Sequence, residues 1–180
     1  SSASNRKTWT FSAWIKRGNV GIAGELFDAY PSTDDRFLFG FTSSDTIWIL
    51  SDVSTTRTLY ATSNAVFRNP STWIHIMCVL DTTESASADR IKLFYNGVQQ
   101  TFSGSPTYPS LNQDQELNNN VQHAIGRIDK PGDPSAYFDG YMADVVFIDG
   151  TALTPSSFGQ TDTSTNRWIP KDVSGLTFGT

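Results

Sequence analysis

The stretch Tyr137–Gly159, YFDGYMADVVFIDGTALTPSSFG, constrains the fold more than any other part of the chain. In its first half, successive side chains point to opposite faces of a strand, and both faces are apolar. Tyr141, Ala143, Val145 and Phe147 fall on one face, and Met142, Val146 and Ile148 fall on the other. A strand that is apolar on both faces belongs inside a two-layer β-sandwich.

The second half of this stretch predicts a turn and then a single helical turn. Asp149-Gly150 is a pair typical of turns. Thr154 suits a helix N-cap and Pro155 suits the first helical position, so one short helical turn is expected over Pro155–Phe158. No amphipathic helical window of useful length occurs elsewhere, which indicates an almost purely β chain.

Nine further segments have the pattern of short strands separated by turn signals. Together with Phe138–Ile148 they are Thr8–Arg17, Glu25–Ala29, Arg36–Phe41, Thr46–Leu50, Thr58–Thr62, Thr72–Asp81, Arg90–Tyr95, Gln99–Phe102 and Val121–Arg127. Thr72–Asp81 is apolar on both faces and should be central, whereas Thr8–Arg17 should keep one face partly in water. Asn96-Gly97 predicts a tight hairpin. The fold class is therefore all-β, an antiparallel two-sheet β-sandwich jelly roll.

The length, charge and cysteine content of the chain exclude several classes of protein. One domain, residues 1–180, is expected, and its abrupt polar ends favour a piece of a longer chain. The net charge is −5 and no basic run exceeds two residues, so no nucleic-acid partner is expected. No apolar run approaches the roughly 18 residues of a membrane span. Cys78 is alone, which excludes an internal disulfide.

Several segments together resemble the laminin-G/pentraxin group of the concanavalin A-like jelly rolls. TWTFSAWIKR is similar to that group's first strand, and STWIHIMCVLD is similar to its W-x-H-x-x-x-x-x-D strand, carried here by Trp73, His75 and Asp81. RIKLFYNGV resembles its Y-x-N-G hairpin, and AIGR followed by FDGYMADVVFIDGTALTPSSFG resembles its closing block. The resemblance covers residues 8–159 and implies a lectin-like fold.

A narrower resemblance suggests a biological setting. NRKTWTFSAWIKRG, FRNPSTWIHI, DTTESASADRIKLFYNGVQ, FIDGTALTPSSFG and RWIPKDVSG look like a module of phage structural and tail-fibre proteins, especially of marine phages. This resemblance implies a non-enzymatic virion domain that is made in the bacterial cytoplasm. Its expected partners are carbohydrate on the host surface and other virion proteins. A homotrimeric fibre would strengthen weak single sites by multivalency. The alternative is a purely structural or decoration domain that mediates virion assembly.

A diverged glycoside hydrolase is the second alternative, because glucanases share this fold. Those enzymes carry Glu-x-Asp-x-x-Glu on one strand, which holds two carboxylates on one face. The three glutamates of this chain, Glu25, Glu84 and Glu116, form no such motif. Glu25 and Asp28 are three residues apart, which in a regular strand places them on opposite faces. No catalytic residue is assigned, although a pair made of aspartates alone stays open.

The histidines and Asp144 are interpreted as structural. Neither His75 nor His123 has metal-ligand spacing to the other or to Cys78. Asp144 interrupts an apolar face, and a buried carboxylate has to be paired or hydrogen-bonded. We expect Asp144 to cap loop amides or to pair with Arg127.

Calcium is the candidate metal, because fifteen of the eighteen acidic residues are Asp and carboxylate oxygens suit this ion. Asp129 and Asp133 share one loop, and Asp28 ends a strand that could approach them. The alternative is a solvated acidic loop. No cofactor is required by either interpretation.

A carbohydrate site needs an aromatic plate for the C–H face of the sugar and amides or carboxylates for its hydroxyls. The aromatic residues that core alternation explains least are Trp48, Tyr60, Tyr108 and Tyr137. Asn118 and Asn120 supply amides. The binding surface is expected in the loops Ser103–Asn120 and Ile128–Ala136, and the alternative is that Trp48 simply packs in a sheet.

Overall fold

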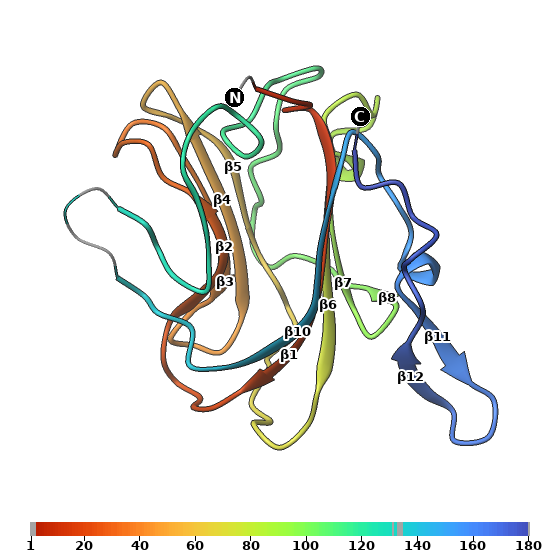
Figure 1. The fold of residues 1–180 in the computed structure, drawn as a ribbon. Coiled ribbons are helices and arrows are strands. Elements are labelled where there is room, and N and C mark those ends of the chain that lie inside the picture. Colours follow the sequence, from red (N-terminus) through yellow and green to blue (C-terminus); the bar gives the residue numbers. More distant parts are fainter. Residues whose placement is uncertain (1–2, 131, 133–134, 180) are drawn as a thin grey trace.

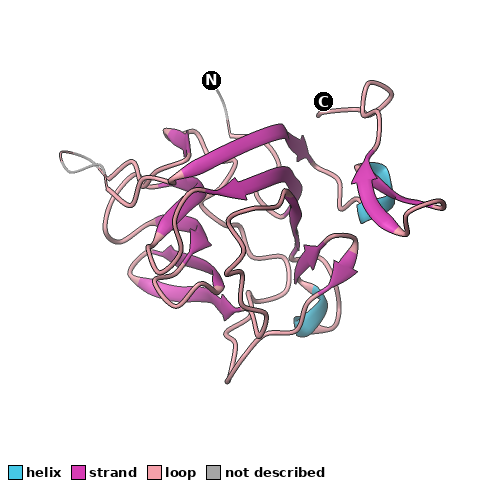
Figure 2. Ribbon diagram, turned by 90° about the horizontal axis from the view of Figure 1, so that it is seen from below, coloured by secondary structure: helices cyan, strands magenta, loops and turns pink. Residues whose placement is uncertain are grey.

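The computed structural model describes residues 3–130, 132 and 135–179. The described part of the chain is built from strands, with two short 3₁₀ turns (Figures 1 and 2). In order these elements are β1 (Thr8–Arg17), β2 (Gly24–Ala29), β3 (Arg36–Phe41), β4 (Ile47–Val53), β5 (Thr56–Thr62), β6 (Ile74–Asp81), η1 (Ser87–Asp89), β7 (Ile91–Tyr95), β8 (Val98–Gln99), β9 (His123–Ile125), β10 (Gly140–Asp149), η2 (Pro155–Ser157), β11 (Gly159–Asp162) and β12 (Arg167–Pro170).

Two five-stranded antiparallel sheets lie face to face (Figure 1). Sheet A has the strand order β10-β1-β6-β7-β8, and sheet B has the order β5-β4-β3-β2-β9. The all-β sandwich jelly roll predicted from the sequence is therefore confirmed. None of the described helices has the length and apolarity needed to span a membrane.

The core between the sheets is built from alternate residues of the strands, as in a regular strand. Trp9, Phe11, Ala13 and Ile15 of β1 are buried there with Ile74, Ile76, Cys78 and Leu80 of β6 and with Phe37, Phe39 and Phe41 of β3. β6 lies in the middle of sheet A, as its two apolar faces predict. Both residues of the Asn96-Gly97 turn have positive φ, 45° and 81°, the backbone that a two-residue hairpin turn between β7 and β8 requires.

The C-terminal segment forms a third, partial layer on the outer face of sheet A (Figure 1). Its apolar contacts join Phe158, Leu153, Val173 and Leu176 to residues of β6 and β10. The hydroxyl of Thr10 donates to the carbonyl of Thr151 and accepts from the N–H of Leu153. The expectation that β1 keeps one face partly in water is therefore wrong, because this layer buries that face.

A β-bulge interrupts β10 and changes the predicted faces. Ser12 of β1 pairs with Val146, and Trp14 pairs with Ala143, so Asp144 and Val145 are left without a partner in β1. Asp144 has a φ of 47° and is exposed. Its predicted burial and its pairing with Arg127 are wrong; Arg127 pairs with Asp129 instead. A bulge re-aims the side chain it carries, here toward solvent.

Local predictions at the end of the chain hold only in part. The helical turn is present as η2, and Thr154 stands at its N-cap, but the Thr154 side chain makes no cap hydrogen bond and contacts the Ser156 hydroxyl instead. Gly150 has a φ of 78°, as the predicted turn requires. β11 and β12 were not expected, and they form a separate hairpin.

Candidate functional site

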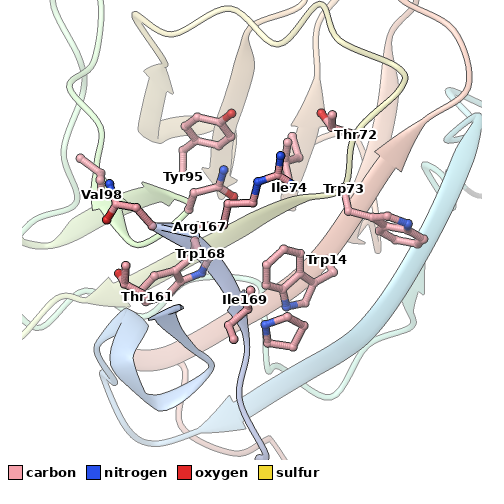
Figure 3. Close-up of a pocket in the computed structure, with 13 residues that line it drawn as sticks. Trp14, Thr72, Trp73, Ile74, Tyr95, Val98, Thr161, Arg167, Trp168 and Ile169 are labelled. Carbon is pink, nitrogen blue, oxygen red and sulfur yellow. The ribbon is translucent and has the colours of Figure 1, made fainter. Parts of the chain in front are cut away.

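A groove of about 860 Å³ lies between the end of sheet A and the β11–β12 hairpin (Figure 3). One wall comes from β1, from the start of β6 and from the β7–β8 turn, and the other wall comes from the hairpin. Its lining residues include Trp14, Trp73, Tyr95, Asn96, Arg167 and Trp168. Four segments that are far apart in the sequence therefore build one open site.

Trp168 of β12 holds the hairpin against sheet A. Its indole covers two glycines, Gly97 and Gly159. A Cβ at Gly97 would lie 2.7 Å from the Trp168 ring, and a Cβ at Gly159 would overlap the indole. Both positions have to be glycine for the ring to pack this closely.

A hydrogen bond to His75 of β6 fixes the orientation of the Trp168 indole. The Nε1–H of Trp168 donates to Nδ1 of His75 over 3.2 Å, and Nε2 of His75 lies 2.8 Å from the Ser12 hydroxyl oxygen. Because an indole can only donate, Nδ1 carries no proton and Nε2–H donates to Ser12. Burial lowers the pKa of His75 to about 4, so the ring is neutral near pH 7. His75 is therefore a buried, hydrogen-bonded residue, as predicted.

The aromatic surface of the groove is open to solvent at Trp73. Its side chain is 43 % exposed, although it is a large apolar group. Its ring centre lies 6.5 Å from that of Tyr141, which is 65 % exposed. Trp14 lies beside Trp73 in the wall and is nearly buried (Figure 3). An exposed indole of this kind can stack on the C–H face of a sugar ring.

Polar groups line the same groove. Asn96 and Asn166 contribute side-chain amides, Thr72 and Thr161 contribute hydroxyls, and Arg167 contributes a guanidinium group. Asn96 already accepts the backbone N–H of His75 through its side-chain oxygen over 2.8 Å. Donors and acceptors therefore surround an aromatic surface, which is the combination that sugar hydroxyls require.

A second hollow of about 310 Å³ adjoins this groove. It shares Trp14, Trp73 and Pro170 with the groove and adds Ala143 and Asp144. The β10 bulge thus brings a carboxylate to the edge of the aromatic wall. Asp144 and Arg167 contribute opposite charges to the two hollows.

The aromatic residues predicted to bind sugar lie elsewhere. Trp48 and Tyr60 share the outer face of sheet B, since Tyr60 pairs with Leu50. Trp48 donates its Nε1–H to Oε1 of Glu25 over 2.9 Å and packs against the outer apolar cluster, whereas Tyr60 is 40 % exposed. A sugar-binding role for these two residues stays a prediction.

The other predicted sugar-binding residues do not join them in one site. Tyr108 packs against the main core, and Tyr137 is 58 % exposed beside a small hollow at Arg17. The Asn118 amide donates to the backbone of Asn5 and to Asp149. Asn120 is exposed, and its backbone N–H donates to the side chain of Asn119.

The candidate calcium ligands make protein contacts of their own. Asp28 accepts the backbone N–H of Ala124 and that of Asp129, one on each carboxylate oxygen. Asp129 pairs with Arg127 over 2.6 Å. Among the described residues no group of three His, Cys, Asp or Glu could hold a metal ion, and Asp133 lies outside them. The calcium site stays a prediction that calorimetry with calcium would test.

The carboxylates of Glu25 and Asp28 share one face of sheet B, contrary to the prediction. The pairing register shifts between Glu25 and Phe27, so both Leu26 and Phe27 face the core. Burial raises the pKa of Glu25 to about 8 and that of Asp28 to about 6. Both side chains are at most 1 % exposed, which excludes direct contact with a substrate in this conformation.

Sequence reasoning missed the groove because its residues looked structural. The alternation predicts a strand over Thr72–Asp81 that includes Trp73, yet β6 begins at Ile74 and leaves Trp73 at the surface. Trp168 lies in a four-residue strand, too short for alternation to identify. The usable signal was the tryptophan of Arg167–Pro170, a large apolar residue in a polar segment.

The two-sheet sandwich with an open aromatic groove defines a lectin-type jelly-roll domain. A laminin G-type sequence model of the concanavalin A-like lectin/glucanases superfamily matches residues 1–157. The chain belongs to this superfamily, which confirms the family predicted from the sequence. β11, β12 and the third-layer residues Phe158, Val173 and Leu176 lie outside the matched residues. A comparison with curated protein sequences gives no match.

Solved structures of the same fold include a pentraxin and a carbohydrate-binding module. A heptameric SAP-like pentraxin from Limulus polyphemus has a TM-score of 0.57 and 17% identity, over 84% of this chain and 68% of its own. The CBM40 of a Ruminococcus gnavus IT-sialidase, bound to α2,3-sialyllactose, has a TM-score of 0.58 and 13% identity, over 84% and 80%.

A third solved structure comes from a glycosidase. Domain 4 of AbnA, a GH43 extracellular arabinanase from Geobacillus stearothermophilus solved with arabinotriose, has a TM-score of 0.54 and 17% identity, over 86% of this chain and 65% of its own. At these identities all three likenesses establish the fold alone.

Proposed function

We propose that this domain binds carbohydrate without catalysis, in the groove between sheet A and the β11–β12 hairpin. The observation that carries the proposal is the exposed indole of Trp73 beside side-chain amides, hydroxyls and a guanidinium group. The sugar-bound CBM40 and the arabinotriose-bound AbnA domain have the same fold and support this class of ligand. The burial of Glu25 and Asp28 supports the absence of hydrolysis.

The finer proposal is that the glycan lies on a host surface and that the domain is part of a phage virion, in a tail fibre or another structural protein. Its support is the resemblance of RWIPKDVSG and the other quoted segments to phage modules. A single open groove binds weakly, so several copies in one particle would raise the avidity. A decoration domain is the rival: a silent glycan array together with a large interface between copies would favour it.

Replacing Trp73 by alanine is expected to weaken glycan binding at least about tenfold, because the sugar loses its aromatic plate. Tyr60→Ala is the matched control, since Tyr60 is 40 % exposed and Trp73 is 43 % exposed, on opposite sheets. A glycan array finds the best glycan, and calorimetry then compares both variants with the wild type. Loss of binding in Tyr60→Ala alone would move the site to sheet B and contradict the proposal.

A further inference from the structure

Arginines of the described residues mostly have partners inside the protein. Six of the eight in the sequence form ion pairs with Asp or Glu, namely Arg6, Arg17, Arg36, Arg57, Arg68 and Arg127. Arg90 donates to the backbone carbonyls of Glu84, Ser85 and Pro109. Arg167 has no partner of either kind among the described residues, and it lines the groove.

Arg167 is also the one charged residue among those described that line this groove. Its neighbour across the hairpin is Asp162, but the carboxylate of Asp162 accepts the hydroxyls of Ser164 and Thr165. The chain has a net charge of −5, and the guanidinium group of Arg167 beside the tryptophans would attract an anionic ligand. A guanidinium group donates two parallel N–H bonds to a carboxylate or a sulfate.

The adjoining hollow has the opposite charge. Asp144 stands at its edge with a φ of 47°, held there by the β10 bulge, and has no hydrogen-bond or ion-pair partner among the described residues. Its carboxylate can accept sugar hydroxyls and repels an acidic group. Trp14 and Trp73 belong to both hollows, so two sugar units could lie side by side on one aromatic wall.

We propose that the two hollows form one extended site for an acidic oligosaccharide. A unit that carries a carboxylate or a sulfate lies against Arg167, and the neighbouring neutral unit lies on Trp73 beside Asp144. The charges thus fix both the class of ligand and its direction in the groove. This inference rests on the proposed function and specifies its ligand. Arg167 lies beyond the residues that the superfamily model matches, so the site belongs to this chain's C-terminal layer.

The test is an array of neutral oligosaccharides, each printed beside its carboxylated and sulfated forms, with lactose, 3′-sialyllactose and 3′-sulfated lactose among them. The wild type is expected to bind acidic members at least about tenfold more tightly than neutral ones. Arg167→Ala should weaken binding of the acidic member by about tenfold to a hundredfold and that of the neutral member less than about twofold. Arg167→Lys keeps the charge but loses the paired donors, and an intermediate loss is expected.

Two further variants make the outcomes distinct. Lys7→Ala removes a positive charge just before β1 begins at Thr8, six residues before Trp14 of that strand, and should leave binding unchanged. Asp144→Asn removes the repulsion, and binding of oligosaccharides that are acidic in both units should rise. Equal binding of neutral and acidic members, lost in Trp73→Ala, would overturn this inference and leave the proposed function standing. No binding to any oligosaccharide on the array would contradict both this inference and the proposed function.

Discussion

Replacing Glu25 by glutamine is expected to stabilise the protein by roughly 4 kcal/mol more at pH 8 than at pH 4. Burial raises the pKa of Glu25 in the folded protein from 4.5 to about 8, and the nearby charge of Asp28 adds to the effect of burial. Below pH 4.5 both states are protonated. Above it the unfolded chain loses its proton while the folded protein keeps it, so the free energy of unfolding falls until pH 8.

The isosteric glutamine cannot ionise, and its oxygen can still accept the indole N–H of Trp48. Urea denaturation of both proteins at pH 4, 6 and 8 measures the difference, in which the contribution of His75 cancels. Glu84→Gln is the control, because the Glu84 side chain is 42% exposed, and its curve should follow the wild type. A pH-independent difference between Glu25→Gln and the wild type would refute a protonated Glu25.

Replacing Trp168 by alanine is expected to lower the free energy of unfolding by about 3 kcal/mol and to release the β11–β12 hairpin. The indole fills the space over Gly97 and Gly159 and supplies the hydrogen bond to His75. Its loss leaves a cavity and an unpaired Nδ1 on a buried ring. Denaturation measures the stability, and hydrogen exchange of the amides in β11 and β12 reports the release.

Gly159→Ala tests the same packing without removing the indole. Its Cβ would overlap the Trp168 ring, so the hairpin should exchange faster here too. Gly175→Ala is the matched control in the same layer, since no atom lies within 4 Å of the Cβ it would add. Hairpin amides that stay as protected in Trp168→Ala as in the wild type would show that Trp168 is not the anchor.

Features that depend on neighbouring residues could be predicted from the sequence. The inward phenylalanines Phe37, Phe39 and Phe41 follow from simple alternation, and the Asn96-Gly97 hairpin follows from the backbone freedom of that pair. The family followed from the order of several weak motifs. Each of these signals lies within a few residues, which is the range over which a strand or turn imposes its pattern.

The bulges in β2 and β10 could not be predicted, because alternation assumes a regular strand and a bulge shifts the pattern by one residue. This error reversed the interpretation of Glu25, Asp28 and Asp144. The groove was missed for a different reason. Its residues come from β1, β6, the β7–β8 turn and β12, and only the packing of the third layer brings them together.

The third layer is synthesised after the strands of sheet A that it covers. Synthesis runs from the N-terminus, so sheet A can form before its cover has left the ribosome. Until then Met77, Val79, Val146 and Ile148 present an apolar face to water. A protein truncated after residue 157, where the superfamily match ends, would keep Leu153 but lose Phe158, Val173 and Leu176, so that face would stay only partly covered and the protein would be prone to aggregate. Expression plasmids for this domain should therefore extend through residue 179, although the recognised family stops earlier.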